Sequence, residues 1–151
     1  MTLKQFVVAG VFAVTAAPAL AEITIVDAYA RSASPMAMSG AAFMEVHNSG
    51  AEDDRLIGVT SDAAARTELH THIDMGDGVM QMSQVEDGLV IPADGAHMLK
   101  RGGDHVMLMG LSGPWKDGET VSVTLEFEQA GQVVVEIPID QRRAPKADDG
   151  S

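Results

Sequence analysis

Two alternating segments near the C-terminal end of the chain constrain the fold most. Apolar residues at 121, 123, 125 and 127 alternate with polar ones, and the same period returns from Val133 to Ile139 after the Ala130-Gly131 turn. A period of two is typical of a strand with one buried face and one solvated face. Two such segments joined by a short turn predict a β-hairpin.

The preceding sequence consists of short apolar segments separated by Gly, Asn and Asp turn residues, with little helical periodicity. We predict further strands over residues 23–30, 41–47, 55–60, 66–72, 79–85, 98–100 and 105–109, with a short apolar run at 89–92. About nine strands at this spacing predict an all-β antiparallel sandwich or barrel. A single helical turn from Ala63 to Arg66, capped by Ser61 or Asp62, is also compatible with the sequence.

The first 21 residues have the features of a secretory signal peptide. Lys4 precedes an apolar run from Phe6 to Ala17, and Ala19-Leu20-Ala21 forms a small-residue cleavage signature. The apolar run is too short for a comfortable membrane span. We therefore expect an exported protein, in a bacterial periplasm, with no membrane span in the mature chain.

The mature sequence is expected to form one domain, because neither a repeat nor a linker divides it. That domain covers residues 22–140. Residues 141–151 are polar, contain Pro145 and lack an apolar run, so they predict a disordered tail.

Composition excludes several classes of function. The chain has 22 acidic and 10 basic residues, and a net charge of −12 disfavours binding to nucleic acid or anionic lipid. It has no cysteine, so it can form neither a disulfide nor a blue-copper centre, which requires a thiolate. No nucleophile elbow or other catalytic signature occurs, and we do not expect an enzyme.

Histidine and methionine are concentrated between residues 70 and 109. This window holds four of the five histidines and six of the ten methionines. Soft thioether and borderline imidazole ligands together select Cu(I) over hard cations. On a strand, alternate residues share a face, which groups His70 with His72, Met80 with Met82, and His105 with Met107 and Met109. A hairpin of 66–72 with 79–85, beside 105–109, would create a His₂Met₂ or His₂Met site.

A metal-free alternative remains open, because methionine commonly fills hydrophobic cores. We predict packing roles for Met36, Met38 and Met44, and a structural role for His47. His97 and Met98 would point to opposite faces of a strand, so both are left out of the predicted site.

Several motifs are shared with a known family. They are Ser39-Gly40-Ala41-Ala42-Phe43-Met44, His47-Asn48, Glu68-Leu69-His70, Gly78-Val79-Met80-Gln81-Met82, Ile91-Pro92-Ala93, His105-Val106-Met107-Leu108-Met109-Gly110-Leu111 and Asp117-Gly118-Glu119-Thr120-Val121. Over about Ile23 to Ile139 the chain resembles the PCuAC family of periplasmic copper chaperones. The resemblance implies a cupredoxin-like Greek-key β-sandwich or barrel that binds one Cu(I) through two histidines and two methionines.

Carried over residue by residue, the resemblance implies that His70, Met82, His105 and Met107 bind the metal. Eleven residues separate His70 from Met82, and twenty-two separate Met82 from His105. Each gap is one residue longer than the family pattern, and turns can absorb such insertions. If the first gap is not absorbed in this way, His72 or Met80 becomes a ligand instead.

The resemblance also implies a function. It indicates a Cu(I) chaperone that delivers copper by ligand exchange to the CuA centre of cytochrome c oxidase. Two alternatives are periplasmic copper buffering or tolerance without dedicated delivery, and a metal-free β-sandwich interaction module.

Overall fold

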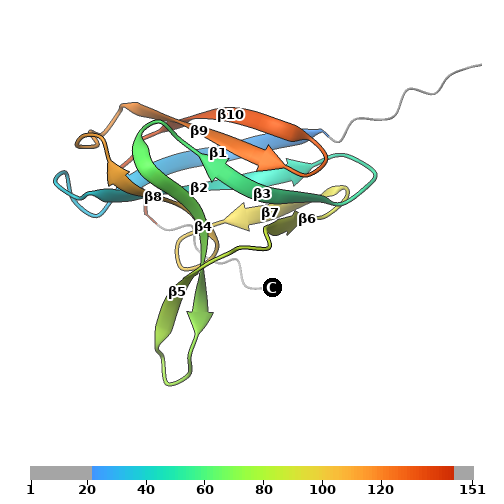
Figure 1. Ribbon diagram of the computed structural model, residues 1–151, viewed down its shortest axis with the longest axis horizontal. Helices are drawn as coiled ribbons and strands as arrows, with labels where there is room; N and C mark the ends of the chain where they lie inside the picture. Colours follow the sequence, from blue (N-terminus) through green and yellow to red (C-terminus); the bar gives the residue numbers. More distant parts are fainter. Residues whose placement is uncertain (1–21, 145–151) are drawn as a thin grey trace, which may run out of the picture.

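Ten β-strands form the protein in the computed structural model, which describes residues 22–144 (Figure 1). The strands are β1 (Ile23–Ser32), β2 (Ser39–Asn48), β3 (Asp54–Thr60), β4 (Ala64–Asp74), β5 (Met80–Gln84), β6 (Leu89–Ile91), β7 (Gly95–Leu99), β8 (His105–Leu111), β9 (Thr120–Phe127) and β10 (Gly131–Pro138). No helix long and apolar enough to cross a membrane occurs between residues 22 and 144.

The strands form two antiparallel sheets. The first has the order β1-β2-β8-β4-β5, with β7 also pairing with β2, and the second has the order β10-β9-β3-β6. Their inner faces enclose one hydrophobic core, whose fully buried members include Val46, Leu56, Ile91, Leu108 and Val123. The predicted all-β antiparallel fold is confirmed.

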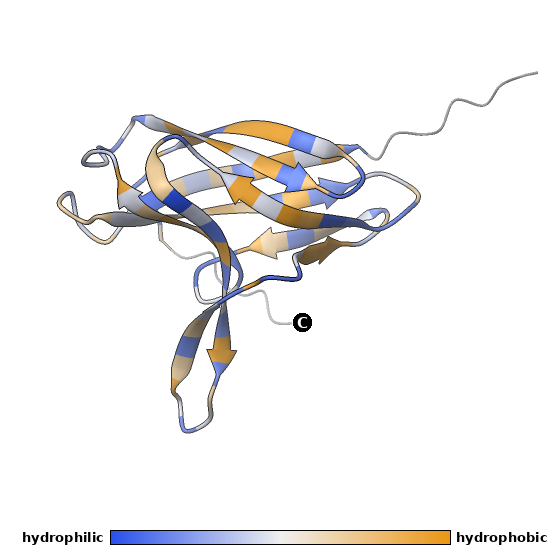
Figure 2. Cartoon of the chain, in the orientation of Figure 1, coloured by the Kyte–Doolittle hydropathy of each residue, from blue (hydrophilic) through white to orange (hydrophobic). Residues whose placement is uncertain are grey.

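The hairpin predicted at the C-terminal end is also confirmed. Strands β9 and β10 pair antiparallel from Phe127 opposite Gly131 to Pro138 opposite Thr120. Val121, Val123 and their alternate neighbours on β9 are buried, while the intervening polar residues are more exposed. Bands of apolar and polar residues along the strands are visible in Figure 2.

The same alternation determines which residues of the first sheet face away from the core. Val106 and Leu108 on β8 are fully buried in the core, as is Leu69 on β4. Because alternate residues point to opposite faces, His105 and Met107 lie on the outer face of the sheet, together with His70 and His72. The sandwich therefore places His70, His72, His105 and Met107 on the same outer face of this sheet.

The predicted helical turn after Ser61 is wrong. Residues Ala63 to Arg66 form no helical turn, because Ala64 already pairs with Leu111 of β8 and the ladder continues from there. The Ser61 hydroxyl does accept the Ala63 N–H at 3.2 Å, but this bond closes a turn that enters a strand.

The predicted packing role of three methionines holds for only one of them. Met44 is 2% exposed and belongs to the core, whereas Met36 is 82% and Met38 is 67% exposed. Both exposed residues lie in the β1–β2 connection, outside the period-two pattern that turns Met44 inward.

The predicted signal peptide, residues 1–21, lies outside the described residues, as do residues 145–151 of the predicted tail. Residues 141–144 are described and contact the domain. The Gln141 side-chain amide donates to the Ser32 hydroxyl at 2.8 Å. Arg143 pairs with Asp27, and its guanidinium carbon lies 4.4 Å from the Tyr29 ring centroid.

Candidate metal centre

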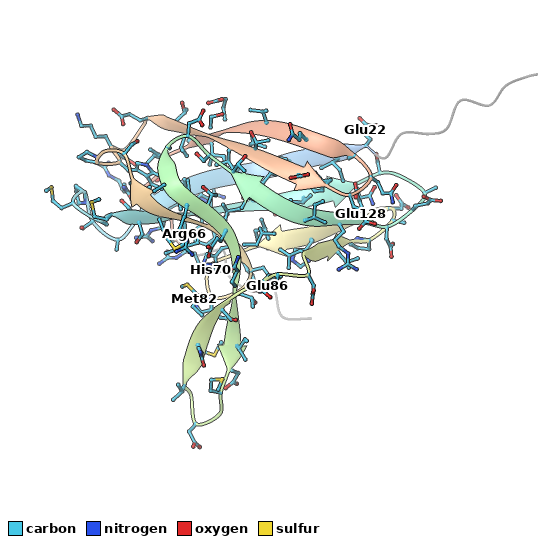
Figure 3. The ribbon with its side chains drawn as sticks, in the orientation of Figure 1. Glu22, Arg66, His70, Met82, Glu86 and Glu128 are labelled. Atoms are coloured by element: carbon cyan, nitrogen blue, oxygen red, sulfur yellow. The ribbon has the colours of Figure 1, made fainter. Side chains whose placement is uncertain are left out.

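Three strands bring the predicted ligands to one region of the outer face. The hairpin of β4 with β5 lies beside β8, as predicted from the sequence. His70 lies directly opposite His105 of β8, and His72 lies directly opposite Met82 of β5. Figure 3 shows His70 and Met82 where the hairpin leaves the body of the sheet.

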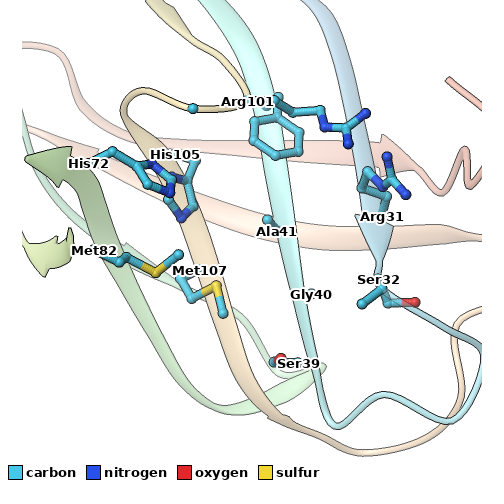
Figure 4. A pocket seen from close by; sticks show the side chains of 13 residues that line it. Arg31, Ser32, Ser39, Gly40, Ala41, His72, Met82, Arg101, His105 and Met107 are labelled. Carbon is cyan, nitrogen blue, oxygen red and sulfur yellow. The ribbon is translucent and has the colours of Figure 1, made fainter. Parts of the chain in front are cut away.

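A cavity of about 340 Å³ opens at this place. Four of the residues that line it are His72, Met82, His105 and Met107. Figure 4 shows the two imidazoles beside each other, with the two thioether side chains next to them. The remaining lining comes from β1, Ala33, β2 and residues 101–102. Two nitrogen and two sulfur donors thus meet around one space.

One backbone carbonyl orients both imidazoles. The Gly103 oxygen lies 2.9 Å from Nδ1 of His105 and 3.3 Å from Nδ1 of His72. A carbonyl only accepts, so each Nδ1 donates its proton, and each neutral ring keeps its lone pair on Nε2. The ring centroids are 5.3 Å apart. A hydrogen bond of this kind fixes the tautomer and orientation of a metal-binding histidine.

Burial favours the neutral form of His105. The side chain is 3% exposed, and this loss of solvation lowers the pKa of His105 below its usual value. The Gly103 carbonyl opposes this shift, while the nearby His72 and His70 add to it. Because only the neutral ring offers a lone pair, the lowered pKa favours metal binding at neutral pH.

His70 lies beside this cavity but has different partners. Its Nε2 donates to Oε2 of Glu68 at 2.9 Å, and its Nδ1 is buried without a hydrogen-bond partner. The hydrogen bond to His70 lowers the pKa of Glu68, with help from Arg66. The ring centroids of His70 and His105 are 6.0 Å apart. His70 therefore offers Nδ1 as a donor, whereas His72 and His105 offer Nε2.

The other candidate residues lie outside the cavity. Met80 is opposite Asp74 near the far end of the hairpin. His97 contacts Asp104 at 2.8 Å, and His47 contacts Glu45 at 3.2 Å. Among residues 22–144, no group of three or more His, Asp or Glu side chains is arranged to hold a metal ion.

Sequence reasoning missed three parts of this centre. The Gly103 carbonyl was missed because a backbone group leaves no residue signature. Arg31 and Arg101 also line the cavity. Neither belongs to a motif, and no pattern in the sequence places them together.

The fold and the His/Met cavity define a cupredoxin-like β-sandwich of the PCuAC type. The structure "Copper-bound PCuAC domain from PmoF2" matches with a TM-score of 0.65 and 26% identity, over 82% of this chain and 96% of that one. "Solution structure of CuI-DR1885 from Deinococcus Radiodurans" matches with a TM-score of 0.59 and 33% identity, over 78% of this chain and 79% of that one. The resemblance to PCuAC domains and the cupredoxin-like fold are thereby confirmed.

A family model described as "Putative lipoprotein LpqE-like" matches residues 23–139, and the chain belongs to this LpqE-like family. A relative from Leifsonia xyli subsp. xyli (strain CTCB07), "Putative lipoprotein Lxx21020", is 37% identical over 99 residues. The match covers 66% of this chain and 59% of that relative, so the chain spans little more than half of the relative's length.

Proposed function

We propose that this chain binds one Cu(I) at the cavity and carries it in the periplasm. The ligands proposed on the geometry are His72, Met82, His105 and Met107, with His70 as the alternative histidine. The observation that carries the proposal is the convergence of these two imidazoles and two thioethers on one cavity, with both imidazoles oriented by Gly103. The names of the copper-bound neighbours support the choice of metal.

The donor set suits a metal that must be held and then released. Imidazole and thioether are neutral donors, and together they match the preference of Cu(I) for soft ligands. Without a thiolate, the site keeps a net positive charge when loaded. Carriage, rather than catalysis, is the function that these ligands favour.

Release is proposed to proceed by ligand exchange to a copper-accepting protein, the CuA domain of cytochrome c oxidase. Met82 is 43% exposed, whereas His105 is nearly buried. A partner ligand therefore reaches the Met82 side of the ion first and can replace this thioether before the inner imidazole. Family relatives named as lipoproteins support an exported location.

Anaerobic titration with Cu(I) against a colorimetric chelator tests the site. We expect one copper per chain, with affinity falling at least tenfold in His72→Ala and in Met107→Leu. Met98→Leu, an exposed methionine on β7 outside the cavity, is the matched control and should bind as the wild type does. If the wild-type chain fails to compete with the chelator, copper binding is wrong and the metal-free interaction module is favoured instead.

His70→Ala distinguishes the two candidate histidines of β4. A smaller loss than in His72→Ala supports the ligand set proposed here, and a larger loss supports His70. X-ray absorption of the loaded protein should count two nitrogen and two sulfur neighbours. Incubation with an apo-CuA domain then tests delivery, and retention of copper by the chain would indicate buffering or tolerance instead.

A further inference from the structure

The charge at the cavity contrasts with the charge of the whole chain. The chain carries a net charge of −12, yet the only charged residues that line the cavity are Arg31 and Arg101. No carboxylate of residues 22–144 lines it. In Figure 4 both guanidinium groups lie across Ala41 from the histidines and methionines. A basic spot thus borders the candidate copper site on an acidic protein.

Ion pairing within the described fold does not account for these two arginines. Within residues 22–144 neither forms an ion pair, and Arg101 makes only a long hydrogen bond of 3.5 Å to the Arg143 carbonyl. Arg143, by contrast, pairs with Asp27 and packs on Tyr29. Guanidinium groups also weaken rather than favour a neighbouring site for a cation. Their position therefore requires a reason other than folding or copper binding.

We propose that the cavity mouth is a docking site for a protein that carries carboxylates around its own copper-accepting ligands. This inference rests on the proposed copper carriage. Arginine pairs with carboxylates through two parallel hydrogen bonds, so Arg31 and Arg101 can fix the orientation of such a partner. The partner's carboxylates also offset the positive charge that accumulates when Cu(I) is present.

The acidic surface of the rest of the chain makes this recognition more selective. An acidic partner is repelled by most of the surface and attracted at the arginines, so productive encounters concentrate at the cavity. Partners with basic surfaces are drawn to other faces, where no ligand exchange is possible. The charge distribution thereby selects both the partner and its orientation.

The protruding hairpin supplies an apolar contact on the opposite side of the cavity from the basic spot. Strands β4 and β5 extend beyond the sheet (Figure 1), and Ile73, Met75, Val79 and Met80 are exposed along the arm. An apolar surface bordered by charged groups is typical of protein–protein interfaces. The arm continues directly into Met82, the ligand that a partner meets first.

Copper transfer to synthetic peptides tests the proposal. The probes are three acceptor peptides with one identical Met/His motif, flanked by Glu, Gln or Lys residues. From the Cu(I)-loaded full chain at low ionic strength, we expect transfer to the Glu peptide to be about tenfold faster than to the Lys peptide. This preference should collapse in about 0.5 M salt, because exposed charges are then screened.

Variants assign the preference to the two arginines. Arg31→Ala/Arg101→Ala should remove most of it, and the charge-reversed Arg31→Glu/Arg101→Glu should invert it. Arg55→Ala/Arg142→Ala changes the net charge equally at residues outside the cavity lining, and should keep the preference. If Arg31→Ala/Arg101→Ala transfers copper with the wild-type preference, the docking proposal is wrong.

Two further measurements separate this proposal from the proposed function. Cu(I) affinity is measured for every variant, and it should not fall in Arg31→Ala/Arg101→Ala, because removing positive charge does not weaken a cation site. If the chain has no Cu(I) affinity, the proposed copper carriage is wrong. Docking can still be tested in that case, because the Glu peptide should shift the NMR signals of Ala41 and Gly102 in the apo chain. Equal shifts with inorganic phosphate alone would overturn docking in favour of a small-anion site.

Discussion

The contact between Gly40 and Trp115 yields a quantitative prediction about the sandwich. Gly40 lies on β2, and a Cβ atom there would approach Cζ3 of Trp115 to 2.3 Å and Cη2 to 2.5 Å. Carbon atoms pack favourably at about 3.5–4.0 Å, so Gly40→Ala creates an overlap of more than roughly 1 Å. The indole is 6% exposed and belongs to the core, so it cannot simply swing into solvent.

The expected loss of stability follows from two opposing effects. Overpacking a core typically costs about 1–3 kcal/mol. Alanine is favoured over glycine in a strand by roughly 0.5–1 kcal/mol, because glycine loses more backbone entropy on folding. Because the overlap is large, the upper part of the overpacking range applies, about 2–3 kcal/mol, and the net decrease in the free energy of unfolding should be about 1–2.5 kcal/mol.

Denaturant unfolding followed by fluorescence measures this change directly, because Trp115 is the only tryptophan of the chain. The emission of folded Gly40→Ala should also shift as the indole moves. Gly113→Ala is the matched control, since a Cβ at Gly113 has no atom within 4 Å. A Gly40→Ala midpoint and emission spectrum identical to those of the wild type would refute the reasoning.

Three further predictions concern single residues. Because burial lowers the pKa of His105, NMR of the apo protein should show this ring titrating below about 6.5, its unfolded value. The contribution of His105 to the free energy of unfolding is then complete above about pH 6.5 and is lost as the pH falls below that value. Denaturant unfolding at about pH 7.5 and at about pH 5 measures this loss. Titration of His105 at or above about pH 6.5 would contradict the prediction. Asn48→Asp should cost about 1–3 kcal/mol or more in denaturant unfolding, because Nδ2 donates to the Glu52 and Ile91 carbonyls and a carboxylate has no hydrogen to donate to them; an unchanged midpoint would show these bonds to be dispensable. Leu125→Ala should cost about 2–5 kcal/mol by the same assay, because Leu125 is fully buried; a cost under roughly 1 kcal/mol would mean that the core collapses around the space.

Local sequence patterns were sufficient for most of the strands and for the hairpin of β9 with β10. The alternation along β9 and β10 reports burial residue by residue, and a short turn between two such segments leaves little choice but a hairpin. The error at Ala63–Arg66 has a physical reason. Four residues are too few to show a period, and pairing with β8 outweighs a local cap. Met36 and Met38 were misassigned because methionine identity alone carries no information about burial.

The sequence alone does not determine whether His70 or His72 is the metal ligand on β4. Both residues share one face of β4, so strand periodicity treats them alike. Register and sheet geometry separate them, since β5 places Met82 opposite His72 and β8 places His105 opposite His70. The cavity then forms at His72, while Glu68 engages His70.

The sequence by itself determined the class of fold and the soft character of the donor atoms, because periodicity and side-chain chemistry are local properties. The tertiary structure alone decided which donors face one cavity, that the Gly103 carbonyl orients two imidazoles, and that Arg31 and Arg101 border the same opening. Those relations depend on strand register and on a backbone atom. They join residues from five strands and a loop, and no local pattern encodes such distances.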